Sequence, residues 1–168
     1  KLYNKKMKKL TFLIISGILF LYVNACTGYT PIYSSSKFNF KIENHSIEGE
    51  ERLANLIYRK LYNVSLSNKD NQNLQSISLS VKTTKEKKPT VKNSSGKILE
   101  YEITLNTNIV INDFYTDKVI LNQNFNYSIS YKVQDEHSET IKLENQNIEN
   151  LVDKTYQDTL MRISDILG

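Results

Sequence analysis

The residue types that carry out catalysis are scarce and scattered in this sequence of 168 residues. His45 and His137 are its only histidines, and neither has a cysteine or a second histidine at the spacing of a metal site. Nucleophilic catalysis needs a base beside a serine or cysteine, yet the only thiol is Cys26 in the N-terminal segment, and no Gly-x-Ser-x-Gly motif occurs. The glycines stand alone, so no phosphate-binding loop is present. We therefore predict a protein that is not an enzyme and that uses no metal or other cofactor.

Lysines are the residues that do gather, and they surround Pro89 and Gly96: Lys82, Lys85, Lys87, Lys88, Lys92 and Lys97. One interpretation is a soluble hairpin tip, because lysines protect an exposed strand edge from aggregation. The other is a site for anionic phosphates, which lysine binds as a point charge. We expect Pro89 and the turn at residues 93–96 to keep this region from becoming regular strand. A hairpin would then bring four of these lysines into one small volume: Lys85, Lys87, Lys88 and Lys92.

The N-terminal segment has the parts of a secretory signal peptide. Lys8 and Lys9 precede an apolar run at residues 10–22, and these 13 residues are fewer than the roughly 20 that cross a bilayer. Ala25 supplies a small residue for cleavage. The predicted organisation is a signal peptide at 1–25 with a natural start perhaps at Met7, a lipidated tether at 26–37, and a single domain at 38–168.

The end of this segment resembles the lipobox of bacterial lipoproteins. There, a branched apolar residue lies three positions before a cysteine and a small residue lies directly before it, as Val23 and Ala25 do before Cys26. The resemblance implies that the thiol receives a diacylglyceryl group and that the new N-terminal amine is acylated after cleavage. The alternative is an ordinary secretory signal that ends near a cysteine. Lipidation is favoured because a single unpaired thiol in a secreted protein otherwise needs another explanation.

Net charge has to be divided between the signal peptide and the rest of the chain. The whole chain carries +4, from 22 basic and 18 acidic residues, but residues 1–25 hold five lysines and no acidic residue. The chain from Cys26 onward therefore has 17 basic and 18 acidic residues. Nucleic-acid binding requires a basic surface, so this balance argues against it.

Apolar residues alternate with polar ones at residues 38–43, which predicts a half-buried strand. Helical spacing begins at Glu50, and its apolar positions are Leu53, Leu56, Ile57, Leu61 and Val64. Residues 63–73 are polar and predict a loop. A last helix is predicted at about residues 143–167, with an apolar side formed by Ile148, Leu151, Val152, Tyr156, Leu160, Ile163 and Ile166.

Three further strands are predicted between these helices, around residues 77–83, 99–111 and 125–133, with a turn at residues 112–117. One stripe of each strand is apolar and the other is rich in Asn, Ser and Thr, as in an antiparallel sheet with one wet face. The strand at 99–111 is long, so we expect it to bend, bulge or protrude. The predicted fold class is α+β: a two-layer sandwich in which a four-stranded, mostly antiparallel sheet carries two helices on one face, in the order β-α-β-β-β-α. Its core should join the stripes of Phe38, Leu53, Ile103, Ile129 and Val152.

The sequence resembles the LptE family of lipopolysaccharide-assembly lipoproteins of the outer membrane, in its α-proteobacterial form. Residues 26–33, Cys-Thr-Gly-Tyr-Thr-Pro-Ile-Tyr, are similar to that family's Cys-Gly-Phe-x-Pro-Leu-Tyr opening with one inserted residue. Residues 47–56 resemble its strand end and arginine-bearing helix start, and residues 127–131 with the final helix resemble its last strand and C-terminal segment.

The resemblance implies a non-catalytic protein, lipid-anchored at the periplasmic face of the outer membrane, with an LptD-like β-barrel and lipopolysaccharide as partners. In that setting Lys85, Lys87, Lys88 and Lys92 are candidate contacts for lipopolysaccharide phosphates. The alternative is an accessory lipoprotein of an ABC-type lipid-transport system, which would share the anchor and an α+β domain.

Overall fold

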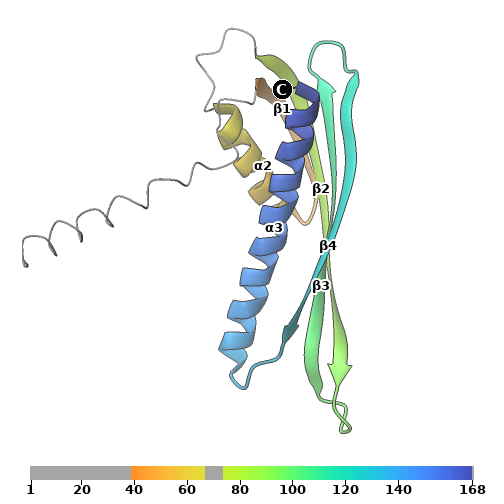
Figure 1. Cartoon of the computed structure of the whole chain (residues 1–168), viewed down its shortest axis with the longest axis vertical. Coiled ribbons are helices and arrows are strands. Elements are labelled where there is room, and N and C mark those ends of the chain that lie inside the picture. Colours follow the sequence, from red (N-terminus) through yellow and green to blue (C-terminus); the bar gives the residue numbers. More distant parts are fainter. Residues whose placement is uncertain (1–38, 67–73, 168) are drawn as a thin grey trace, which may run out of the picture. The chain divides into compact units, whose positions relative to one another are not determined.

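A computed structural model describes residues 39–66 and 74–167 of the chain. The predicted signal peptide with Met7, the tether with Cys26, and Phe38 lie outside the described residues. Figure 1 shows the six elements: β1 (Phe40–Gly49), α2 (Glu51–Leu66), β2 (Gln75–Lys92), β3 (Ile98–Asp113), β4 (Val119–Lys132) and α3 (His137–Leu167).

The four strands form one sheet in the order β1-β2-β3-β4. β1 runs parallel to β2, whereas β2 with β3 and β3 with β4 are antiparallel. Both helices pack on the same side of this sheet (Figure 1). The predicted fold class and the predicted order of elements are therefore confirmed.

A single hydrophobic cluster between the helices and the sheet takes side chains from all six elements. Leu53 of α2, Ile103 of β3 and Val152 of α3 are at most 1% exposed, and Ile129 of β4 packs against the cluster partly buried. Every second residue is buried from Ile77 to Thr83 of β2 and from Ile103 to Ile111 of β3, as the alternating sequence predicts. The buried hydroxyls of Thr83 and Thr107 lie 3.3 Å apart and hydrogen-bond to each other, so these polar side chains are satisfied in the core.

β1 continues six residues beyond the predicted strand because a bulge interrupts its alternation. Phe40 and Ile42 are buried, but the register with β2 shifts between Ile42 and Asn44. One extra residue in a strand reverses which positions face the core. His45 therefore stacks on Tyr58 of α2, with ring centroids 4.0 Å apart.

Gly49 joins β1 to α2 at a point where the chain passes very close to β2. Its φ is +81°, and a Cβ built on it would lie 2.2 Å from the carbonyl oxygen of Thr83. That oxygen accepts a hydrogen bond from the N–H of Glu50 at 2.7 Å. The α2 helix extends to Leu66, so the predicted loop at 63–73 begins too early; residues 67–73 lie outside the described residues.

The expectation that Pro89 interrupts the strand is wrong, because β2 continues through it to Lys92. Pairing with β1 ends at Thr83, so from Thr84 onward β2 is an edge strand. Proline is tolerated at such an edge, where its missing N–H would have no partner, and at bulges. A register shift with β3 follows directly between Pro89 and Val91. The β2–β3 hairpin thus protrudes past the end of β1, as the length of the predicted strand at 99–111 implies (Figure 1).

The α3 helix begins at His137, six residues before the predicted start. The hydroxyl of Thr140 accepts a hydrogen bond from the N–H of Gln134 at 2.9 Å, which fixes the chain at the helix start. Farther along, the buried hydroxyls of Thr155 and Thr159 donate to the carbonyls of Leu151 and Thr155 one turn earlier. At the other end, Ile166 is 47% exposed, so its predicted place on the packed side is wrong.

Candidate functional site

The sheet face that the helices leave uncovered, here called the open face, carries mainly Asn, Ser and Thr side chains. Strand register arranges them in rows: Ser46 on β1 lies beside Ser80 on β2, which lies beside Val110 on β3. These are the polar stripes that the sequence predicts to be wet. The open face consists of Asn44, Ser46, Glu48, Ser78, Ser80, Lys82, Thr84, Glu86, Lys88, Glu100, Glu102, Thr104, Asn106, Asn108, Val110, Asn112, Asn122, Asn124, Asn126, Ser128, Ser130 and Lys132.

Side-chain hydrogen bonds connect β3 and β4 across the open face. The Nδ2 of Asn108 donates to the Oδ1 atoms of Asn122 and Asn124, at 3.1 and 2.8 Å. The hydroxyls of Thr104 and Ser128 lie 2.8 Å apart. Most charged residues of the open face lie toward the β2–β3 hairpin, where the ammonium of Lys88 is 2.7 Å from the carboxylate of Glu86. The ammonium of Lys82 is 3.2 Å from the carboxylate of Glu48 at the β1 edge. Between these charged groups the surface is an array of amides and hydroxyls, which both donate and accept hydrogen bonds.

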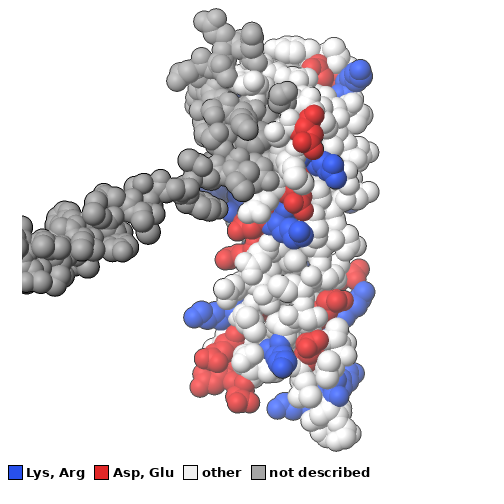
Figure 2. Space-filling view, in the orientation of Figure 1, with Lys and Arg blue, Asp and Glu red and all other residues white. Residues whose placement is uncertain are grey.

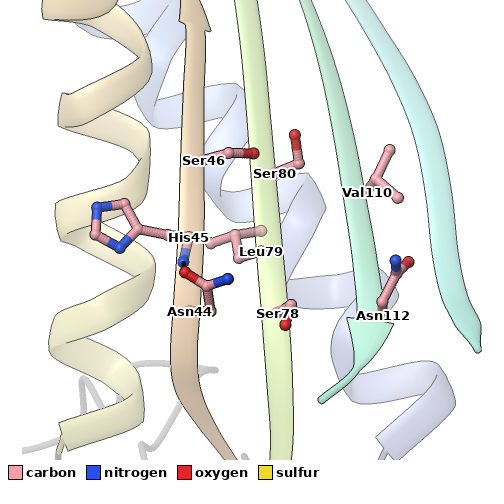
Figure 3. Close-up of a pocket in the computed structure, with 8 residues that line it drawn as sticks. All are labelled: Asn44, His45, Ser46, Ser78, Leu79, Ser80, Val110 and Asn112. Atoms are coloured by element: carbon pink, nitrogen blue, oxygen red, sulfur yellow. Dashed lines mark hydrogen bonds between the residues drawn. The ribbon is translucent and has the colours of Figure 1, made fainter. Parts of the chain in front are cut away.

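Two shallow depressions indent the open face. The first, about 150 Å³, is lined by Asn44, His45, Ser46, Ser78, Leu79, Ser80, Val110 and Asn112. Figure 3 shows its serine and asparagine side chains along β1, β2 and β3, with His45 directed toward α2. The Oδ1 of Asn112 is buried here and accepts no hydrogen bond from residues 39–66 or 74–167, although the Nδ2 of the same side chain donates to Asp117. The second depression, about 250 Å³, is lined by Lys82, Thr84, Asn106, Thr107, Asn108, Asn124, Phe125 and Asn126.

The serine, threonine and asparagine side chains that line these depressions can donate and accept hydrogen bonds. Neither lining places a base beside a serine hydroxyl in a hydrogen-bonded pair like those of nucleophilic enzymes. Within residues 39–66 and 74–167, no three His, Cys, Asp or Glu side chains converge as a metal site would require. In the same ranges, no helix combines the length and the apolarity needed to cross a bilayer.

The four candidate phosphate-binding lysines do not share one surface. Lys85 and Lys87 pair with Leu105 and Ile103 of β3 and so point to the helix side of the sheet. Lys88 points to the opposite side, where its ammonium is 2.7 Å from the carboxylate of Glu86. Lys92 lies past the register shift, beside the turn. The continuous β2 strand spreads these lysines along its length, so the predicted gathering in one small volume is wrong.

Lys87 is held in a cluster that the sequence does not predict. Its ammonium lies 2.5 Å from the Oε2 of Glu144 on α3 and 4.3 Å from the ring centroid of Tyr101. The hydroxyl of Tyr131 donates to the same carboxylate oxygen at 2.8 Å. This cluster fastens the beginning of α3 to the β2–β3 hairpin. Lys87 would have to leave Glu144 in order to bind an external phosphate.

The pKa of Glu144 reflects these contacts. Partial burial alone raises it, but the hydrogen bonds from Lys87 and Tyr131 outweigh burial, so the net pKa lies below the ordinary value for glutamate. A depressed carboxyl pKa stabilises the fold above the unfolded-state pKa of about 4.3, and this contribution disappears as the pH falls through the folded-state pKa.

We expect Glu144→Gln to lower the free energy of unfolding by about 1 kcal/mol at pH 7, because the pair with Lys87 is only partly screened. The difference from the unchanged protein should shrink toward pH 3. Urea unfolding followed by circular dichroism at several pH values measures it, with exposed Glu149→Gln on the same helix as the matched control. A Glu144→Gln difference that persists unchanged at pH 3 would contradict this account.

Charged side chains elsewhere are mixed in sign. Figure 2 shows basic and acidic residues interleaved over most of the visible part of the described surface, with a group of acidic residues at the lower left. Sequence reasoning missed a different surface feature, the exposed aromatic residues Phe114 and Tyr115 at the β3–β4 turn. The sequence does contain a sign of this feature, namely two adjacent aromatic residues inside a predicted polar turn.

The fold is shared with several solved structures. A lipoprotein B from Nitrosomonas europaea is 11% identical, with a TM-score of 0.56 over 82% of this chain and 91% of that one. A minor lipoprotein from Acinetobacter baumannii is 15% identical, with a TM-score of 0.50 over 76% and 92%. A protein from Caulobacter crescentus is 12% identical, with a TM-score of 0.53 over 79% and 93%. No protein-family model and no curated protein sequence matches the chain. The chain therefore has the fold of known bacterial lipoproteins.

Proposed function

We propose that this protein is a non-catalytic lipoprotein, anchored through Cys26 at the periplasmic face of the outer membrane, that binds an LptD-like β-barrel and assists lipopolysaccharide assembly. The observation that carries the proposal is the open face. A four-stranded sheet normally buries one face and solvates the other, and here the solvated face carries rows of Asn, Ser and Thr between charged residues, of which Lys82 pairs with Glu48 and Lys88 with Glu86.

A large membrane β-barrel offers a matching surface, because its interior is polar and lined with hydrogen-bonding side chains. Rows of Asn, Ser and Thr can exchange hydrogen bonds with water for hydrogen bonds with such a lumen. The rigid sheet beneath these side chains keeps the entropic cost of docking low.

Two further observations support the anchored location. The lipobox-like sequence before Cys26 implies attachment of several acyl chains, and stable membrane anchoring requires more than one chain. The fold is also that of structures named as lipoproteins. Weak contact of lipopolysaccharide phosphates with Lys85, Lys87, Lys88 and Lys92 belongs to the same proposal. Of these four, Lys87 and Lys88 already have carboxylate partners, so we expect the contact to be easily screened by salt.

The test is affinity purification of the tagged protein from solubilised membranes, followed by mass spectrometry. We expect one large outer-membrane β-barrel protein to co-purify. Cys26→Ser serves as the control. This variant should no longer be recovered in the membrane fraction, while its domain stays folded. Recovery of inner-membrane transport components instead of a barrel would replace this proposal with the ABC-transport alternative.

A further inference from the structure

The β3–β4 turn presents apolar side chains to solvent although its backbone is well fixed. Tyr115 is 80% exposed, Val119 55% and Phe114 43%; these three residues are called the aromatic tip. The carboxylate of Asp113 accepts hydrogen bonds from the N–H groups of Tyr115 and Thr116, at 3.1 and 2.9 Å. Exposed apolar groups held together at one site usually mark a surface that contacts a partner or a membrane.

The aromatic tip lies at the end of the sheet where the chain from Cys26 joins the fold. The N–H of Gln75 donates to the carbonyl of Asn39, the first described residue, at 2.9 Å. The neighbouring residue, Ser76, accepts a hydrogen bond from the N–H of Phe114 at 3.0 Å. The β2–β3 turn lies at the opposite end of the sheet (Figure 1). Since β2 has 18 residues, the two ends are about 60 Å apart.

Chain length limits how far this end can be from a membrane that holds Cys26. Asn39 lies 13 positions after Cys26, and a fully extended chain of that length spans at most about 45 Å. The aromatic tip is therefore within reach of the bilayer, whereas the β2–β3 turn points away from the attachment. This step rests on the lipid anchor of the proposed function.

The chemistry of the tip suits the interfacial layer of a bilayer. Tyrosine places its ring among lipid headgroups and its hydroxyl in water, and phenylalanine and valine gain from leaving water. The tip has no large net charge nearby, because Lys118 and Lys41 offset all but one of the carboxylates of Asp113, Asp117 and Glu43. Zwitterionic lipid is therefore sufficient as a ligand. We propose that the aromatic tip inserts into the headgroup region of the leaflet that carries the Cys26 lipid, which holds the sheet upright on the membrane.

The chain contains no tryptophan and one cysteine, so it can be probed at single sites. Tyr115→Trp places one fluorophore in the tip, and Val91→Trp places one on the distant hairpin, where Val91 is 43% exposed, as Phe114 is in the tip. The chain from Cys26 to Gly168 keeps every core residue, since the core lies between Phe40 and Ile163. Each variant is coupled through Cys26 to a maleimide phospholipid in phosphatidylcholine vesicles, with or without brominated acyl chains.

We expect brominated lipid to quench most of the emission of the Tyr115→Trp variant and little of the emission of the Val91→Trp variant. Adding Phe114→Ser to the first variant should reduce the quenching. Equal quenching of both variants, or none, would overturn the proposal. A blue shift without bromine quenching would also overturn it, because it shows burial against a second copy of the chain. Chemical coupling through Cys26 does not depend on lipidation in cells. A negative result would therefore contradict only the contact of the tip with lipid. The proposed anchor and barrel partner are tested separately by the affinity purification.

Discussion

Ile103→Asp is expected to unfold most of the protein at room temperature. Ile103 is 0% exposed and belongs to the hydrophobic cluster on the helix side of β3. The substitution removes a buried aliphatic side chain and places an unpaired carboxylate in an apolar environment. We expect a loss of about 5 kcal/mol, which is comparable to the whole stability of many domains. Urea unfolding of the chain from Cys26, followed by circular dichroism, measures it.

The matched control is Thr104→Asp, one residue along the same strand. Thr104 lies on the open face, where its hydroxyl is 2.8 Å from that of Ser128. A carboxylate there stays hydrated, so we expect a loss of about 1 kcal/mol, close to the value of one hydrogen bond. If Ile103→Asp and Thr104→Asp had equal effects, the assignment of the two sheet faces would be wrong.

Gly49→Ala is expected to produce the second large loss. Its Cβ would lie 2.2 Å from the carbonyl oxygen of Thr83, a backbone atom that cannot rotate away. Relief of the clash requires the start of α2 to move off β2, which breaks the 2.7 Å hydrogen bond between Glu50 and Thr83. A φ of +81° is also unfavourable for alanine. We expect the clash, the lost hydrogen bond and this φ together to destabilise the fold by about 3 kcal/mol or more.

A comparison with Gly96 separates the two causes of this loss, the steric clash with Thr83 and the positive φ. It has the same φ of +81°, but a Cβ there would meet no atom within 4 Å. Gly96→Ala therefore pays only the backbone penalty, roughly 1–2 kcal/mol. Thermal unfolding of both variants gives the comparison. A Gly96→Ala loss as large as that of Gly49→Ala would show that close approach to β2 is not what requires glycine at position 49.

Periodicity was sufficient to predict the elements of this fold because its sheet has one dry and one wet face. Ile77, Leu79 and Val81 alternate with serines, and the buried side chains follow that alternation. The order of elements then leaves few arrangements in which two amphipathic helices cover one sheet. The parallel pairing of β1 with β2 follows from the helix between them.

The errors occur where local signals and tertiary context disagree. The bulge before Asn44 breaks the period of β1, so a pattern search ends the strand at residue 43. Pro89 resembles a strand breaker until pairing shows that this part of β2 is an edge. The first turns of α3 are polar, and their start depends on the hydroxyl of Thr140 rather than on apolar spacing. None of these contacts is local enough to be visible in periodicity.

The candidate site was predicted unevenly for the same reason. The Asn and Ser stripes of the open face follow from alternation alone. The partner of Lys87 does not, because Glu144 lies 57 residues farther along the chain and meets it only when α3 packs on the sheet. The unpartnered Oδ1 of Asn112 likewise depends on the packing of three strands.

The most direct test of the proposed function is site-specific photo-cross-linking in cells from the open face. A photoreactive amino acid replaces Asn106 at the centre of that face, and the same amino acid at exposed Glu149 on α3 is the control. We predict that the probe at position 106 captures one large outer-membrane β-barrel protein, identified by mass spectrometry, and that the probe at position 149 captures much less of it. Capture of only soluble or inner-membrane proteins from position 106, or equal capture of the barrel from both positions, would contradict the proposal.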